Sequence, residues 1–179
     1  MSLYNRGILK KDLKDFKGAI EDFTKVIEIN PSEAMSYQKR AETKCNIEDN
    51  IGAIEDFTKA IEINPKDATS YLIRGALKND LKDYKGAIVD YSKAIEINPK
   101  DMDSFKARGT AKNQLKDYRG GIDDFTKAIL INPQDATLFY LRGLSRLTIG
   151  QKESGCLDLK KALELGYSPA DKAISDLCK

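Results

Sequence analysis

DFTKAIEINP, residues 56–65, is the stretch that decides the fold, because near copies of it recur along the chain. The copies read DFTKVIEINP, DYSKAIEINP and DFTKAILINP, and they begin at Asp22, Asp90 and Asp124. The tripeptide INP therefore returns every 34 residues, and a fifth, weaker copy, DLKKALELGY, begins at Asp158 without the proline. A fixed period of this length is typical of proteins that stack copies of one small supersecondary unit.

Each unit contains two helical patterns, which are clearest in the third unit. Asp67 is a plausible N-cap for a helix from Ala68 to about Leu81. Asp83 can cap a second helix from Tyr84 to about Ile97, where apolar residues recur at spacings of one, three and four. Pro99 prevents continuation, because it lacks an N–H and disfavours helix at the preceding residue. No segment alternates with the period of a strand, so the fold is predicted to be all-α.

The period divides the chain into five units, at about residues 1–33, 34–67, 68–101, 102–135 and 136–167, which we expect to form a single array over residues 1–179. Residues 169–178 (PADKAISDLC) are predicted to form a helix with one apolar stripe that caps the last unit, since a stacked repeat otherwise leaves an apolar face exposed. The first unit has no such cap. Further repeats or a targeting segment before Met1, or pairing of two chains there, are alternatives that the sequence leaves open.

Small residues occupy the same place in every first helix, where two helices must approach each other. These residues are Gly7, Ala41, Gly75, Gly109 and Gly143. A glycine inside a helix costs roughly 1 kcal/mol relative to alanine, so its repetition makes sense if the missing side chain permits close packing. The aromatic side chains expected to fill the seam beside them are Phe23, Phe57, Tyr91 and Phe125.

Together these features resemble the tetratricopeptide repeat over about residues 1–166. The resemblance rests on the 34-residue period, the small residues, the Ala-x-x-x-aromatic pattern of the second helix, the closing proline and an aromatic in the first helix (Tyr37, Tyr71, Phe105 and Phe139). It implies a right-handed α-solenoid of tandem helix-turn-helix repeats whose first helices line a concave groove. The chain departs from the family pattern at Leu3, which replaces the aromatic, and in having arginine before every small residue.

Each of these arginines is followed 16 residues later by an aspartate on the second helix. The predicted pairs are Arg6 with Asp22, Arg40 with Asp56, Arg74 with Asp90, Arg108 with Asp124 and Arg142 with Asp158. An antiparallel hairpin can bring the two together, so we predict a ladder of partly buried, bidentate ion pairs. The alternative is that the arginines point into the groove and bind an acidic ligand. We favour the structural role, because an arginine in a packed interface needs a carboxylate partner.

The resemblance also implies which side chains face the groove, namely those that flank the core stripe of each first helix. These are Tyr4, Asn5, Ile8, Lys11, Gln38, Lys39, Glu42, Leu72, Ile73, Ala76, Asn79, Lys106, Thr110, Asn113, Tyr140, Leu141, Leu144 and Leu147. They vary from unit to unit while the framework repeats, as a graded binding surface would. The alternative is packing between repeats or under the C-terminal helix. We favour that alternative for Leu144 and Leu147, and both interpretations stay open for Leu72, Lys106 and Tyr140.

Composition narrows the classes of function. The formal net charge is +2, which argues against a dedicated nucleic-acid binder, and no apolar run approaches the ~18 residues of a membrane span. Histidine is absent, which removes the commonest general base and metal ligand, so no enzyme, cofactor or metal site is expected. The three cysteines are scattered without a CxxC pair and are interpreted as reduced, which favours a cytoplasmic location.

We therefore expect a protein-protein interaction scaffold that holds a peptide or helix of a partner protein in its concave groove, and that binds neither nucleic acid nor membrane. The alternative is a structural self-association module, a homo-oligomer that assembles through its uncapped N-terminal repeat. The sequence names neither the partner nor the pathway.

Overall fold

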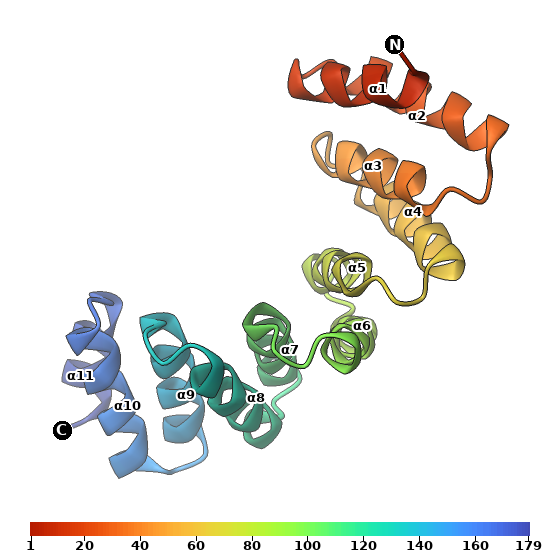
Figure 1. Ribbon diagram of the computed structural model, residues 1–179. Helices are drawn as coiled ribbons and strands as arrows, with labels where there is room; N and C mark the ends of the chain where they lie inside the picture. The colour runs from red at the N-terminus through yellow and green to blue at the C-terminus, as the bar shows by residue number, and fades with distance from the viewer. The chain divides into compact units, whose positions relative to one another are not determined.

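The computed structural model describes residues 1–179 and contains α-helices without any β-strand, which confirms the predicted all-α class. The chain divides into two compact units, residues 1–81 and residues 82–179. Figure 1 labels the helices of both units in chain order. None of the helices is long and apolar enough to cross a membrane. The single array over residues 1–179 stays a prediction.

The first unit contains five helices. They are α1 (Leu3–Asp12), α2 (Phe16–Ile29), α3 (Ala34–Cys45), α4 (Asn50–Ile63) and α5 (Ala68–Asp80). Helices α1 and α2 form one hairpin and α3 and α4 the next, while α2 packs on α3 and α4 packs on α5. A core of Ala41, Ala53, Phe57 and Leu77 joins α3, α4 and α5. Each helix therefore buries its apolar stripe against the next in sequence.

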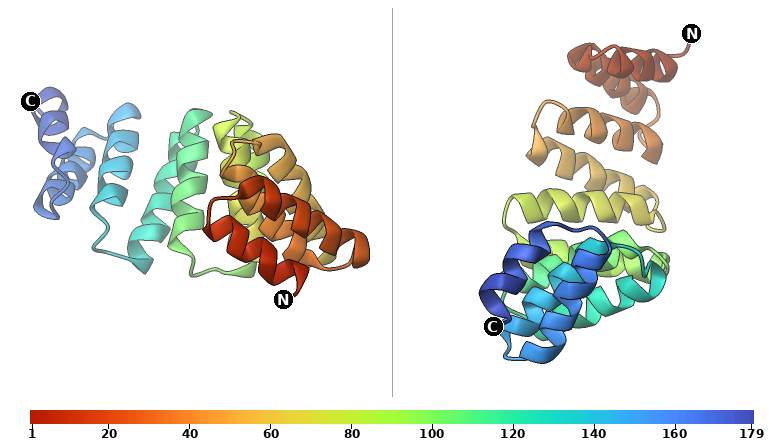
Figure 2. Two further views of the ribbon diagram at one scale, coloured as in Figure 1. Left: turned by 90° about the horizontal axis from the view of Figure 1, so that it is seen from above. Right: turned by 90° about the vertical axis from the view of Figure 1, so that its left-hand side faces the viewer.

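The second unit contains six helices. They are α6 (Tyr84–Ile97), α7 (Met102–Gln114), α8 (Tyr118–Ile131), α9 (Ala136–Thr148), α10 (Lys152–Glu164) and α11 (Pro169–Leu177). Consecutive helices pack on one another, and the core around Phe105, Phe125 and Leu138 joins α7, α8 and α9. Helix α11 lies beside α10 (Figure 2) and spans nearly the predicted residues 169–178.

The second helices begin at a repeated aspartate cap. The cap residues are Asp15, Asp49, Asp83 and Asp117, and each accepts a hydrogen bond of 3.0 Å from the backbone N–H of a glycine three residues later. A Cβ added to Gly18 would lie 2.3 Å from Asp15 Oδ2, so a larger residue there would require the carboxylate to shift. Asp67 likewise accepts from the Ser70 N–H at 3.0 Å. Both caps predicted in the third repeat are thus confirmed, and each satisfies an N–H that the helix itself leaves unpaired.

The turn inside each repeat passes through the left-handed region of backbone conformation at one fixed position. The φ angles are 62° at Lys14, 61° at Glu48, 63° at Lys82, 63° at Lys116 and 81° at Gly150. Only the fifth turn has glycine at this position, and glycine adopts this conformation without steric cost. The other four hold an L-residue in a conformation that costs roughly 1–2 kcal/mol.

The small residues of the first helices face the aromatic seam, as predicted from their spacing. A Cβ added to Gly7 would lie 2.9 Å from Phe23 Cε1, and one added to Gly109 would lie 2.9 Å from Phe125 Cε1. Both aromatic rings are fully buried. The missing side chain therefore gives each of these two rings its close approach to the first helix, although Ala41 holds the same place beside the buried Phe57.

One prediction about the cysteines is wrong. Cys156 on α10 and Cys178, which directly follows α11, form a disulfide with a Cα–Cα distance of 5.8 Å. Their separation of 22 residues in sequence hid this pairing, because only the return of α11 along α10 brings the two residues together. Cys45 is free. The interpretation of all three cysteines as reduced therefore fails for this pair, and the cytoplasmic location stays a prediction.

Candidate functional site

The arginines of the first helices make forked contacts with the aspartates of the second helices. Arg6 Nε and Nη2 donate to the two carboxylate oxygens of Asp22 at 2.8 and 2.6 Å. The same bidentate geometry joins Arg40 to Asp56, Arg108 to Asp124 and Arg142 to Asp158. The remaining predicted pair, Arg74 with Asp90, has its members in different units and stays a prediction.

Two further contacts accompany the ion pairs of Arg40, Arg108 and Arg142, and sequence reasoning missed both. A cation one turn after the arginine reaches the same carboxylate, as Lys112 does to Asp124 at 2.8 Å. The third guanidinium nitrogen donates to a hydroxyl of the preceding repeat, as Arg108 Nη1 does to Ser92 Oγ at 3.0 Å. The sequence carries a signal for both contacts. A lysine or arginine lies four residues after every ladder arginine, and a threonine or serine lies two residues after Asp22, Asp56, Asp90 and Asp124.

These contacts leave the arginines little capacity for a ligand. The bond from Arg6 holds the pKa of the Asp22 carboxyl well below its usual range, although burial alone would raise that pKa. The bond to Asp22 in turn raises the pKa of Arg6. A guanidinium that already donates to a carboxylate and a hydroxyl has no free pair of N–H groups for the bidentate binding of an acidic peptide. The geometry therefore favours the structural role.

Several candidate groove residues in the first unit bind one another. Glu42 accepts from Lys11 on α1 at 2.9 Å and from Lys39 on α3 at 2.9 Å, so it joins two neighbouring first helices. Burial raises the pKa of Glu42, but the bonds from Lys39 and Lys11 outweigh it and the net pKa is lowered. Gln38 Nε2 donates to Asp67 at 2.7 Å and to Ser70 at 3.0 Å. The polar part of this face is therefore a preformed network.

The other candidates of the first unit differ in how far they remain available. Tyr4 packs its ring edge-to-face on Phe23 at 5.9 Å, and burial together with nearby Glu33 and Glu42 raises the pKa of Tyr4. Ile73 packs against the core of α3, α4 and α5, as the alternative interpretation has it. The candidates that stay exposed or half-buried without such a contact are Asn5, Ile8, Leu72, Ala76 and Asn79.

In the second unit the polar candidates also have partners. Lys106 Nζ donates to Asp135 Oδ2 at 3.3 Å, and Thr110 Oγ1 donates to the Lys106 carbonyl at 2.9 Å. Asn113 Nδ2 donates to Ser145 Oγ at 2.7 Å, but its Oδ1 is buried without a partner. That oxygen occupies the space that a Cβ on Gly121 would fill. Asn113 is half-buried and joins α7 to α9 through its amide nitrogen.

The apolar candidates of α9 fall into two groups. Leu141 packs against the core around Phe105 and Phe125, and Leu147 fills the place left by the missing side chain of Gly155. Tyr140 and Leu144 instead line a cavity of about 350 Å³ between α9 and α11, together with Pro169, Lys172, Ala173, Asp176 and Leu177. The ring of Tyr140 also meets that of Tyr167 at 4.8 Å, which fixes one wall of this cavity.

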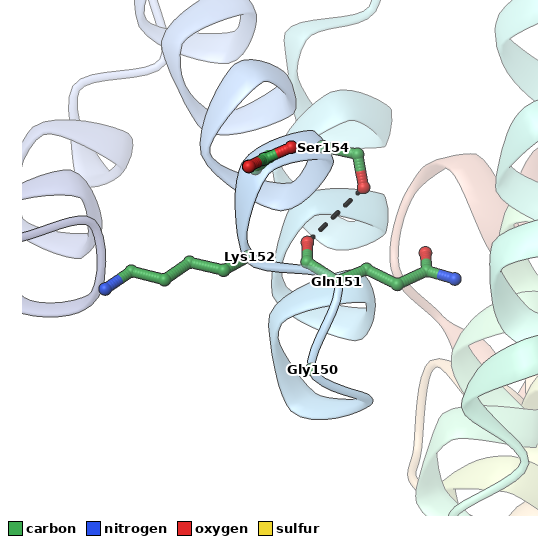
Figure 3. Close-up of a pocket in the computed structure, with 5 residues that line it drawn as sticks. Gly150, Gln151, Lys152 and Ser154 are labelled. Carbon is green, nitrogen blue, oxygen red and sulfur yellow. Dashed lines mark hydrogen bonds between the residues drawn. The ribbon is translucent and has the colours of Figure 1, made fainter.

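A second, polar pocket lies at the start of α10 (Figure 3). Ser154 Oγ donates to the Gln151 carbonyl at 3.3 Å, while the side chains of Gln151 and Lys152 extend in opposite directions. The pocket is the open first turn of a helix whose N-cap side chain makes no capping bond. No cluster of three His, Cys, Asp or Glu residues could hold a metal ion anywhere in the chain.

Repeated hairpins with a constant ion-pair framework and variable first-helix faces define a helical-repeat protein. Residues 1–33 and 68–101 match the family model of the tetratricopeptide repeat. These two stretches are tetratricopeptide repeats, as the sequence resemblance implies. A comparison with curated protein sequences finds no match.

Solved structures with the same fold cover nearly the whole chain. A crystal structure of MamA is 25% identical, with a TM-score of 0.86, and the alignment covers 92% of this chain and 96% of MamA. MamA from Desulfovibrio magneticus RS-1 is 17% identical, with a TM-score of 0.85 over 93% of this chain and 94% of that one. YrrB, described as a tetratricopeptide repeat protein with an unusual peptide-binding site, is 19% identical, with a TM-score of 0.87 over 97% of this chain and 90% of YrrB.

Proposed function

We propose that this protein is an interaction scaffold that holds a peptide or helix of a partner protein on its first-helix faces. Binding then consists of burying a few apolar anchor side chains on a preformed surface, with no bond chemistry. The peptide-binding description of YrrB supports a ligand of this class. The arginine ladder belongs to the scaffold in this proposal, and the variable residues outside it carry specificity.

The observation that carries the proposal is the cavity beside Tyr140 and Leu144. Its walls are largely apolar, and Lys172 and Asp176 of α11 provide opposite charges at its edge. A cavity of about 350 Å³ is at the small end of ligand pockets, which suits one large apolar side chain of a peptide. The amide and carbonyl groups of such a peptide could reach the two charged groups.

The polar network of the first unit supports a second contact region on that unit. Lys11, Lys39 and Glu42 hold one another in place, so a ligand that approaches Leu72 and Ile8 meets side chains whose rotamers are already restricted. Restricting a surface before binding reduces the conformational entropy lost on association. We therefore assign Leu72 as the apolar anchor position of the first unit.

The test is a peptide selection followed by affinity measurements. Peptides selected from a random library on the intact protein are titrated against the wild type and against Tyr140→Ala, Leu144→Ser and Leu72→Ser by calorimetry. A Tyr140→Ala change should weaken a peptide bound at α9 by about tenfold or more, as expected for an aromatic anchor. Leu130→Ser on α8 is the control, because Leu130 is 79% exposed and lies outside the candidate faces. Equal affinity for all variants would refute the proposal.

Self-association through the N-terminal repeat is a second candidate, favoured by the state of Arg6. Its side chain is 43% exposed, against 12% for Arg142. A cavity of about 420 Å³ lies nearby, lined by Leu3, Tyr4, Val26 and Ile29 among others. Light scattering over a range of concentrations tests this candidate: a growing mass supports it, and a constant monomer mass at high concentration refutes it.

A further inference from the structure

A cavity of about 490 Å³ opens beside the disulfide, and both Cys156 and Cys178 are among its lining residues. The two cysteines are half-buried, so the sulfur atoms lie at a wall of the cavity and within reach of a small molecule that enters it. The peptide-binding proposal makes no use of this place, which lies on the α10 side of α11. The cavity between α9 and α11 has a different set of lining residues.

The charges around the disulfide are mainly positive. Lys152 and Lys160 stand four residues before and four residues after Cys156, so all three lie on one face of α10. Lys179 adds a third ammonium group, and Glu153 is the only carboxylate side chain among the lining residues. Lys152 Nζ already donates to the main-chain oxygen of Lys179 on the α11 side of α10 (Figure 3), so the attraction for an incoming anion comes mainly from Lys160 and Lys179.

We propose that this cavity is a thiol–disulfide exchange site for a small thiol that carries a carboxylate. The ammonium groups attract both the carboxylate and the attacking thiolate of such a molecule, because electrostatic attraction raises the local concentration of an oppositely charged reactant. A neutral or cationic thiol lacks part of this attraction. The reductant is therefore an anionic small thiol, and the protein disulfide is the oxidant.

The exchange runs in two steps. The thiolate sulfur of the first small molecule forms a bond to Cys178 Sγ, the Cys156–Cys178 bond breaks, and its electron pair leaves on Cys156 Sγ. A second thiolate then attacks the mixed disulfide and releases Cys178 as a thiolate together with the small-molecule disulfide. The two protein thiolates take up the two protons that the small thiols lost. One protein disulfide is thereby reduced while two small thiols become one disulfide.

The order of attack follows from the position of the lysines. A disulfide breaks faster when the departing sulfur is the better leaving group, and nearby cations stabilise a thiolate. Cys156 has Lys152 and Lys160 one turn away on either side along α10, whereas Cys178, which follows α11, has the single cation Lys179 beside it. Departure of Cys156 therefore favours the mixed disulfide at Cys178.

The consequence of exchange is the release of α11. This helix has nine residues, fewer than the ~12–15 that a helix needs to be even marginally stable in isolation, and it buries only Ala170 and Ala173. Without the covalent link it should leave α10, which removes the α11 wall of the cavity at Tyr140 and Leu144. This consequence for ligand binding rests on the proposed function, but the exchange reaction itself does not.

The experiment compares three small thiols on the intact oxidised protein: mercaptopropionate, mercaptoethanol and cysteamine, which carry a carboxylate, no charge and an ammonium. Reduction rates are measured by trapping the released thiols and detecting them by mass spectrometry, and each rate is divided by the thiolate concentration. At low ionic strength, mercaptopropionate should react about threefold or more faster than cysteamine, and 0.5 M salt should abolish the difference. Equal rates for the three thiols would overturn the proposal.

Variants identify the residues responsible. Lys160→Gln should slow reduction by mercaptopropionate and narrow its advantage, while the matched control Lys161→Gln should not, because Lys161 is paired with Glu164 and does not line the cavity. Peptide mapping after a short reaction should find the mixed disulfide on Cys178. A mixed disulfide on Cys156, or identical rates in Lys160→Gln and wild type, would contradict the assignment. None of these measurements depends on whether a peptide binds at Tyr140, so the two proposals can fail separately.

Discussion

Arg40 Nη1 donates a hydrogen bond of 3.0 Å to Thr24 Oγ1, and this bond joins the second helix of one repeat to the first helix of the next. The same guanidinium holds Asp56 within its own repeat. One side chain thus connects three helices, and its counterparts at Arg108 and Arg142 do the same. The ladder is a packing device as much as an electrostatic one, which leads to the first prediction.

Replacing Arg108 with leucine should destabilise the protein strongly. Asp124 is 1% exposed, and the change leaves its buried carboxylate with Lys112 as its remaining charged partner. Breaking a buried pair from one side costs about 3 kcal/mol or more. Urea denaturation measures the loss, and adding Asp124→Leu should recover part of it. Lys59→Ala, which removes an exposed pair with Glu62, is the control and should change stability by less than about 0.5 kcal/mol.

Acid should weaken the fold below about pH 4, the ordinary range of carboxyl pKa values. The pKa of Asp22 is lowered in the folded state, so the folded protein holds this carboxylate charged where the unfolded chain would protonate it. Its contribution is therefore present above the unfolded pKa and is lost as pH falls through the folded pKa. Urea midpoints at pH 7, 5 and 3 should fall less steeply for Asp22→Asn than for wild type. The exposed Asp103→Asn should follow the wild type, and parallel curves for all three proteins would contradict the prediction.

Replacing Lys116 with glycine should stabilise the protein. Lys116 has a φ of 63°, which costs an L-residue roughly 1–2 kcal/mol, while the glycine loses about 0.5–1 kcal/mol through the greater freedom of the unfolded chain. The expected net gain is about 0.5–1 kcal/mol, measured by denaturation. The reverse change at the equivalent position, Gly150→Lys, should lower stability by a similar amount. A loss of stability in Lys116→Gly would show that the lysine side chain matters more than the backbone.

Replacing Leu3 with tyrosine should fill the cavity at the start of α1. In the second repeat, Arg40 lies over the ring of Tyr37 at 5.6 Å, and Leu3 holds the matching place in the first repeat. A ring there should pack beside Arg6 and gain about 0.5–1 kcal/mol from the cation–π contact. Thermal unfolding detects the gain. Leu3→Ala should destabilise, and equal melting of Leu3→Tyr and wild type would mean that the ring does not enter the cavity.

Removing the disulfide should loosen α11 while the core of the second unit stays intact. A crosslink that closes a loop of this size contributes about 2–4 kcal/mol to the structure that it holds. In Cys156→Ser/Cys178→Ser, hydrogen exchange should therefore accelerate over residues 169–177 but not in α7 or α8. The free Cys45→Ser is the control. Unchanged protection of α11 in the double variant would show that noncovalent packing suffices to hold it.

The helices and the ladder were accessible from the sequence because their signals are local and repeated. The cap at Asp83, the proline after the helix and the 34-residue period predicted where α6 begins and ends. The separation of 16 residues along a hairpin predicted that Arg108 lies opposite Asp124. The candidate groove was less accessible. Ile73 and Leu141 occupy first-helix positions like those of their neighbours, yet both pack into cores.

The sequence by itself therefore determined the all-α class, the repeat and the sites of helix initiation, since these depend on residues close together in the chain. Only the tertiary structure decided which side chains stay available. Gln38 and Lys106 donate to the aspartates that cap α5 and α9, and Tyr140 lines a cavity with α11. It also decided the pairing of Cys156 with Cys178. The physical reason is that burial and disulfide pairing depend on distances between helices, which spacing along one helix does not specify.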